Sequence, residues 1–111
     1  MKALLNRHQF IPLIPDYVSS RSLAANTAES VTIPSFAKLA LFTPAPRIND
    51  FFVKLNAIAT IPADLDDGSA SFANPVLLEL DVSGTGNYLS LITNNAGTTI
   101  VTVAFYKDIY V

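Results

Sequence analysis

Hydrophobic and polar residues alternate through most of the chain after Glu29. In residues 76–82 every second side chain is apolar, namely Val76, Leu78, Leu80 and Val82. The same pattern recurs at Val101, Val103 and Phe105. A period of two residues is typical of a β-strand that buries one face. The pattern therefore predicts a domain built from strands.

Turn-forming residues divide this region into about seven short segments. The predicted strands are 29–33, 38–43, 50–56, 57–61 (a short edge strand), 76–82, 88–93 and 98–107. Ser83–Gly86 and Asn94–Gly97 are predicted to close hairpins, and 64–75 is predicted to be a long polar loop. Short strands at this spacing indicate an all-β fold, a single antiparallel β-sandwich of the jelly-roll or Ig-like type.

The alternation also predicts which side chains fill the sandwich. The expected core is Leu39, Leu41, Phe51, Val53, Leu55, Val76, Leu78, Leu80, Leu89, Leu91, Val101, Val103 and Phe105. Several of these strands are apolar on their second face as well, which predicts an additional contact there. Phe42, Phe52 and Tyr106 are the aromatic residues expected in that second patch.

Residues 1–28 differ from the rest of the chain and predict an extended N-terminal arm before a sandwich domain at 29–111. Pro12 and Pro15 interrupt an apolar run from Phe10, and each proline favours extended geometry in the residue before it. The arm has a net charge of +2, whereas residues 29–111 have a net charge of −4. This difference favours an arm that contacts a neighbouring copy.

The large apolar side chains of the arm need a surface to cover them. The predicted interface with a neighbouring subunit or another protein is Phe10, Ile11, Leu13, Ile14 and Tyr17 on the arm, with Phe42, Phe52 and Tyr106 on the body. Two arrangements are compatible with the pattern: the arm reaches a neighbour, or it folds back over its own sandwich.

Composition narrows the classes of function. Only 14% of residues are charged, against roughly 25% in an ordinary soluble domain, which favours burial of part of the surface between subunits. The net charge of −2 disfavours nonspecific nucleic-acid binding. The chain has no cysteine, and its apolar runs are too short for a secretory signal or a membrane span.

No residue pattern indicates catalysis, and we expect no catalytic, cofactor or metal site. Asp64–Gly68 clusters carboxylates, but their spacing does not fit a calcium loop. His8 is the only histidine and lies in the arm, where nothing would hold it as a base. Glu79 and Asp81 share one strand face and are expected to be solvated. Gly84-Thr85-Gly86 precedes a strand, so it is interpreted as a turn.

Several segments of residues 22–106 resemble small virion proteins of tailed bacteriophages. They are Asn26–Pro34, Ala37–Phe42, Asp50–Lys54, the Pro-Ala-Asp loop from Ile61, Tyr88–Ile92 and Val101–Tyr106. The likeness is a pattern of strands and turns without an active-site motif, and residues 1–21 lie outside it.

The resemblance implies a structural virion protein, not an enzyme, of the capsid decoration or cement type. It would sit on the capsid surface, bind the major capsid protein and copies of itself as a homotrimer, and bind neither nucleic acid nor membrane. The alternative is a neck, tail or fibre-tip module that recognises a host-surface ligand. Asn87, Tyr88, Asn94 and Asn95 are the loop residues that would suit such a module.

Overall fold

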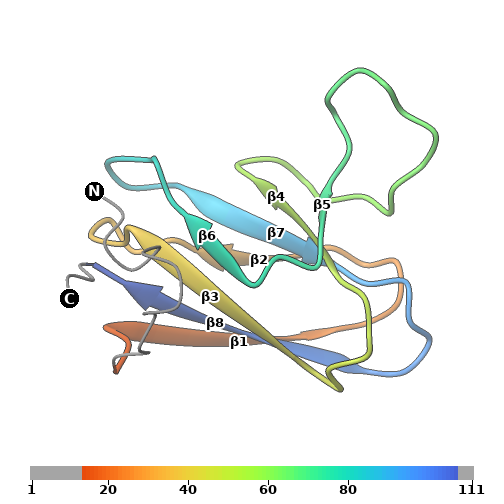
Figure 1. The fold of residues 1–111 in the computed structure, drawn as a ribbon, viewed down its shortest axis with the longest axis horizontal. Coiled ribbons are helices and arrows are strands. Elements are labelled where there is room, and N and C mark those ends of the chain that lie inside the picture. The colour runs from red at the N-terminus through yellow and green to blue at the C-terminus, as the bar shows by residue number, and fades with distance from the viewer. Residues whose placement is uncertain (1–13, 108–111) are drawn as a thin grey trace, which may run out of the picture.

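Two antiparallel four-stranded sheets pack face to face in the computed structural model, which describes residues 14–107 (Figure 1). The strands are β1 (Tyr17–Leu23), β2 (Glu29–Thr32), β3 (Leu39–Ala45), β4 (Phe52–Leu55), β5 (Phe72–Ala73), β6 (Leu77–Glu79), β7 (Tyr88–Ile92) and β8 (Thr99–Tyr106). Sheet I has the order β1-β8-β3-β6, and sheet II has the order β2-β7-β4-β5. The predicted all-β sandwich is therefore confirmed.

The strand order is that of an eight-stranded jelly roll. Apart from β4 to β5, each strand is followed in the chain by a strand of the other sheet. An Ig-like sandwich would instead pair consecutive strands within its sheets. Of the two topologies that the sequence allowed, the structure has the jelly roll, a fold used by viral capsid and lectin domains. Within residues 14–107, no helix is long and apolar enough to cross a membrane.

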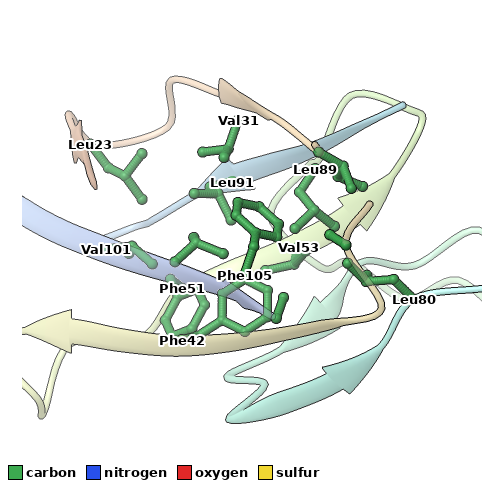
Figure 2. Close-up of a cluster of buried hydrophobic side chains, with 14 residues drawn as sticks. Leu23, Val31, Phe42, Phe51, Val53, Leu80, Leu89, Leu91, Val101 and Phe105 are labelled. Atoms are coloured by element: carbon green, nitrogen blue, oxygen red, sulfur yellow. The ribbon is translucent and has the colours of Figure 1, made fainter. Parts of the chain in front are cut away.

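The core lies between the sheets and is built from the inward side chains of both. Its largest members, Phe51 and Phe105, are fully buried, and Figure 2 shows them beside Phe42 and Leu91. The rings of Phe42 and Phe51 are 5.9 Å apart and tilted by 34°, which is a favourable aromatic contact. The complete buried cluster is Leu23, Val31, Ile33, Ala37, Ala40, Phe42, Phe51, Val53, Leu80, Leu89, Leu91, Val101, Val103 and Phe105.

The prediction for β3 chose the wrong face. Ala40 and Phe42 point into the core, whereas Leu39 and Leu41 lie on the outer face of sheet I. Both faces of this strand are apolar, so alternation gave no information about which face turns inward. The other members of the predicted core on β4 to β8 are buried or pack against the core, apart from two.

Those two exceptions, Leu55 and Val76, are exposed. Leu55 is the last residue of β4, where the strand leaves the sandwich, and Val76 lies just before β6. The alternation of apolar residues continues through Leu55 and Val76, although the opposite sheet no longer covers these two positions.

The two predicted hairpins are wrong. β6 and β7 belong to different sheets, and so do β7 and β8, so that Ser83–Gly86 and Asn94–Gly97 carry the chain from one sheet to the other. Gly84 and Gly86 have φ angles of +81° and +88°, which confirms the turn itself. Turn residues predict a reversal of the chain. Whether the two strands then pair or stack depends on which apolar faces must meet.

The predicted arm does not extend to residue 28 in the structure. Residues 17–23 form β1, which pairs along its whole length with β8, from Tyr17 opposite Phe105 to Leu23 opposite Thr99. Leu23 is fully buried in the core. Serines at 19, 20 and 22 gave β1 too little hydrophobic alternation to be recognised as a strand.

Residues 57–61 are not an edge strand; they lie across the outer face of sheet II. Ala59 donates its backbone N–H to Ser90 Oγ on β7 at 2.9 Å. Thr60 donates to Ser71 Oγ at 3.1 Å. Ala59 thereby joins Phe52 and Ile92 in a second buried cluster. The loop that follows, up to β5, projects from the body (Figure 1).

Candidate functional site

The outer face of sheet I is the most distinctive surface of the described protein. Its outward side chains from three adjacent strands are uncharged: Val18, Ser20 and Ser22 on β1, Ile100, Thr102, Ala104 and Tyr106 on β8, and Leu39, Leu41, Thr43 and Ala45 on β3. We refer to these eleven residues as the uncharged face. Extended surface areas of low polarity are uncommon on monomers and often mark a site of contact. This arrangement therefore favours contact with another protein surface.

Polarity changes in steps along the uncharged face. At one end, Leu39, Ala104 and Tyr106 form a buried cluster with Leu41 and Leu77 packed against it. In the middle, Ser20, Thr102 and Thr43 form one row across the three strands. Ser20 Oγ and Thr102 Oγ1 are 3.0 Å apart and hydrogen-bonded, which leaves few free donors on this row.

The far end of the uncharged face is exposed and carries small side chains. Ser22, Ile100 and Ala45 form its last row. Ile100 is 44% exposed, and Val18 on the same face is 52% exposed. Small and β-branched side chains on a pleated surface leave a smooth area that a second protein can approach closely.

Charge is concentrated on other parts of the described molecule. Arg21 alternates with the uncharged positions of β1, so it points to the other side of sheet I, where its guanidinium forms an ion pair with Glu29 on β2. This pair is exposed and contributes little to stability. Glu79 lies on β6 at the margin of the uncharged face, opposite Leu39.

The predicted interface residues of the arm fall in two groups. Phe10, Ile11 and Leu13 lie outside the described residues. Ile14, the first described residue, is 93% exposed, and Tyr17 is 52% exposed at the start of β1. The Tyr17 ring also contacts Phe105, with centroids 6.4 Å apart, so this tyrosine is partly engaged by its own sandwich.

The three predicted interface residues of the sandwich body do not form an exposed patch. Phe42 is 4% exposed within the core, which contradicts its assignment to the second face. Phe52 is covered by the 57–61 segment on sheet II. Tyr106 is on the uncharged face but is only 2% exposed. The three side chains therefore do not form one surface, because they lie in three different clusters.

A hollow of about 420 Å³ opens between the end of β3 and the residues around β5. Its lining includes the buried residues Phe42 and Phe51, the exposed Val76, and the charged residues Arg47 and Asp50. Asn74 holds the two sides together: its side chain donates to Asp50 Oδ1 at 3.0 Å and accepts from the Phe51 N–H at 3.0 Å. A lining that combines apolar and polar residues, at this volume, is one that small ligands use.

The acidic loop has the geometry of a turn. Asp67 accepts hydrogen bonds from the Ser69 hydroxyl at 2.5 Å and from the Ser69 N–H at 3.0 Å. These bonds lower the pKa of the exposed Asp67 carboxyl. Among residues 14–107, no three carboxylate, histidine or cysteine side chains are grouped so that they could hold a metal ion. His8 lies outside the described residues.

The loop amides are used mainly inside the molecule. Asn87 accepts from Asn56 Nδ2 at 2.9 Å and donates to the Ser83 carbonyl at 3.1 Å. Asn95 donates to the Asp50 carbonyl at 3.3 Å. These bonds fix the connections between the sheets, so two of the four residues considered for ligand binding have a structural role.

The protein matches no family model, no curated protein and no solved structure. The sequence pattern does not reveal the uncharged face, because it assigns parts of two strands elsewhere. Ser20 and Ser22 fall within the predicted arm, and Leu39 and Leu41 fall within the predicted core. The signal that could have revealed it is the neutrality of every second residue in 18–22, 39–45 and 100–106.

Proposed function

We propose that this protein is a structural virion protein of the capsid decoration or cement type. It binds the outside of a tailed-phage capsid and stabilises the lattice. The observation that carries the proposal is the uncharged face on a chain with few charges. This face is exposed at Val18, Ser20, Ser22, Thr43, Ala45 and Ile100. The jelly roll supports it as a fold-level analogy, since viral capsid proteins use this fold for structural work.

The size of the uncharged face indicates what else the interface needs. Strands of seven or eight residues at about 3.4 Å each, three abreast at about 4.8 Å, cover roughly 25 × 14 Å, or about 350 Å². A stable interface buries about 800 Å² on each partner. Because Leu39, Ala104 and Tyr106 at one end are already buried, the face supplies less than half of the contact. The apolar residues 10–17 are proposed to supply much of the remainder, bound to the capsid or to a neighbouring copy.

Charge placed on the uncharged face tests the proposal. Thr43 is exposed in the middle row, so Thr43→Lys adds a cation that docking would have to desolvate. We expect at least a tenfold loss of binding to purified capsids that lack the protein. Ser30→Lys is the matched control, because Ser30 is exposed on the edge strand β2 of the other sheet.

The outcome of this experiment separates the two classes of function. Wild-type binding to capsids that is lost with Thr43→Lys and kept with Ser30→Lys supports the proposal. Equal loss in both variants contradicts docking by the uncharged face. Failure of the wild-type protein to bind capsids, together with binding to cells or glycans, favours the host-ligand module.

The hollow beside Arg47 is the observation that favours this second function. Its volume and its combination of Arg47 and Asp50 with apolar lining residues suit a small polar ligand such as a glycan unit. Arg47→Ala would then abolish glycan binding and leave capsid binding unchanged. A glycan panel on which wild-type protein gives no signal would refute this second function.

A further inference from the structure

β1 is the least protected of the four edge strands. A sheet edge presents unpaired N–H and C=O groups that can pair with another chain. Proteins usually prevent this pairing with short edge strands, prolines or lysines. The other three edges, β2, β5 and β6, are only four, two and three residues long, and prolines at 34 and 75 follow or flank them. β1 has seven residues and contains neither proline nor lysine. Pro15 flanks it and Arg21 lies within it, so its length is what distinguishes it from the other edges.

We propose that β1 pairs antiparallel with β1 of a second copy, with Ser20 opposite Ser20 at the two-fold axis. This register is the one that pairs all seven residues, from Tyr17 opposite Leu23 of the other copy. It also places Arg21 opposite Ser19. A register centred on Arg21 would place two guanidinium groups directly opposite each other, which is destabilising.

The surfaces beside β1 suit this pairing. The two uncharged faces join across the axis into one continuous face, because the outward residues of β1 are Val18, Ser20 and Ser22. β1 itself contains no carboxylate, so the paired strands place no acidic side chain opposite another. Small serines let the two backbones approach to the normal strand separation of about 4.8 Å.

The pairing also brings one described apolar residue close to the partner. Ile14, three residues before β1, is 93% exposed. Because the start of each β1 lies beside the end of the partner's β1, Ile14 comes next to the partner's strand, where its side chain can be covered.

This inference deepens the self-association that is part of the proposed function, and it changes the number of subunits. An isologous edge contact produces a dimer. The trimer was implied only by the resemblance to decoration proteins. A monomer in solution that still binds capsids would refute β1 pairing and leave the proposed function intact.

Single cysteines test the register, since the natural chain has none. Residues directly opposite in an antiparallel pair have Cβ atoms about 4.5–5.5 Å apart, close enough for a disulfide with a small shift. We expect Ser20→Cys to form a covalent dimer within minutes of mild oxidation at micromolar protein. Ser30→Cys on β2 and Thr43→Cys inside sheet I are the controls and should react at least tenfold more slowly.

Sedimentation of the wild-type protein completes the test. A dimer that becomes a monomer in Ser22→Lys, with the melting temperature measured in dilute solution unchanged within about 3 °C, supports the pairing. Ser22 is exposed on β1, so the variant tests the edge without opening the core. A wild-type monomer or trimer, or faster crosslinking of Thr43→Cys than of Ser20→Cys, would overturn it.

Discussion

Phe105 occupies the centre of the core and is fully buried between the two sheets (Figure 2). We expect Phe105→Ala to lower the free energy of unfolding by about 3–5 kcal/mol, since it removes a large apolar side chain and leaves a cavity. Ile100→Ala is the control on the same strand; Ile100 is exposed on the outer face, so the loss should be about 1 kcal/mol or less. Urea unfolding measures both, and equal losses would contradict the assignment of the two faces.

Tyr106 makes the stability of the folded protein depend on pH in the alkaline range. Burial, and after it the negative charge of Asp16, raises the pKa of the Tyr106 phenol above its ordinary value of 10.0. The folded state therefore favours the neutral phenol. The resulting stability is complete below pH 10 and is lost as the pH rises from 10 through the folded-state pKa. Tyr106→Phe should make the urea midpoint less dependent on pH above 10; an unchanged slope would exclude this origin.

At the scale of single residues, alternation predicted burial well where only one face of a strand is apolar. On β8, Val101, Val103 and Phe105 point inward as expected. On β3, Leu-Ala-Leu-Phe offers apolar residues to both sides, and the inward residue Phe42 packs against Phe51. The inward face depends on how the two sheets pack, so the alternation within β3 alone does not contain it.

The covering segment 57–61 depends on one buried hydroxyl. Ser90 is 3% exposed and accepts the N–H of Ala59, which is 1% exposed. Ser90→Ala would leave that N–H buried without an acceptor, at a cost of about 1–3 kcal/mol.

Ser30→Ala is a close control for this prediction, because Ser30 lies directly opposite Ser90 on β2 but is exposed. We expect it to change the unfolding free energy by less than about 0.5 kcal/mol. Hydrogen exchange at Ala59 should become faster in Ser90→Ala alone. If the two alanine variants have the same stability, segment 57–61 is held by other contacts.

At the scale of elements, the positions of most strands could be predicted but their partners could not. Turn residues located the reversals after β6 and β7, yet both reversals lead to the opposite sheet. β1 was hidden because its serines face solvent or the sheet edge, where no hydrophobic pattern is required. β5 has only two residues, which is too short to produce any period.

At the scale of the molecule, the fold class followed from the sequence, whereas the candidate site did not. A jelly roll brings β1, β8 and β3 together although 15 to 75 residues separate them in the chain, and the uncharged face exists only after this assembly. Of the eight interface residues that hydrophobicity predicts, folding buries Phe42, Phe52 and Tyr106, and three lie outside the described residues. The exposed side chains of the uncharged face are neutral and mostly small. Residues of this kind do not stand out in a sequence.

The stability of the capsid itself tests the account most directly. Capsids that lack the protein should be heated with and without saturating wild-type protein, with Thr43→Lys as the variant that cannot dock. We expect the temperature at which the shells rupture and release DNA to rise by several degrees with wild-type protein and to stay at the undecorated value with Thr43→Lys. An unchanged rupture temperature under saturating wild-type protein would contradict the role of a cement protein.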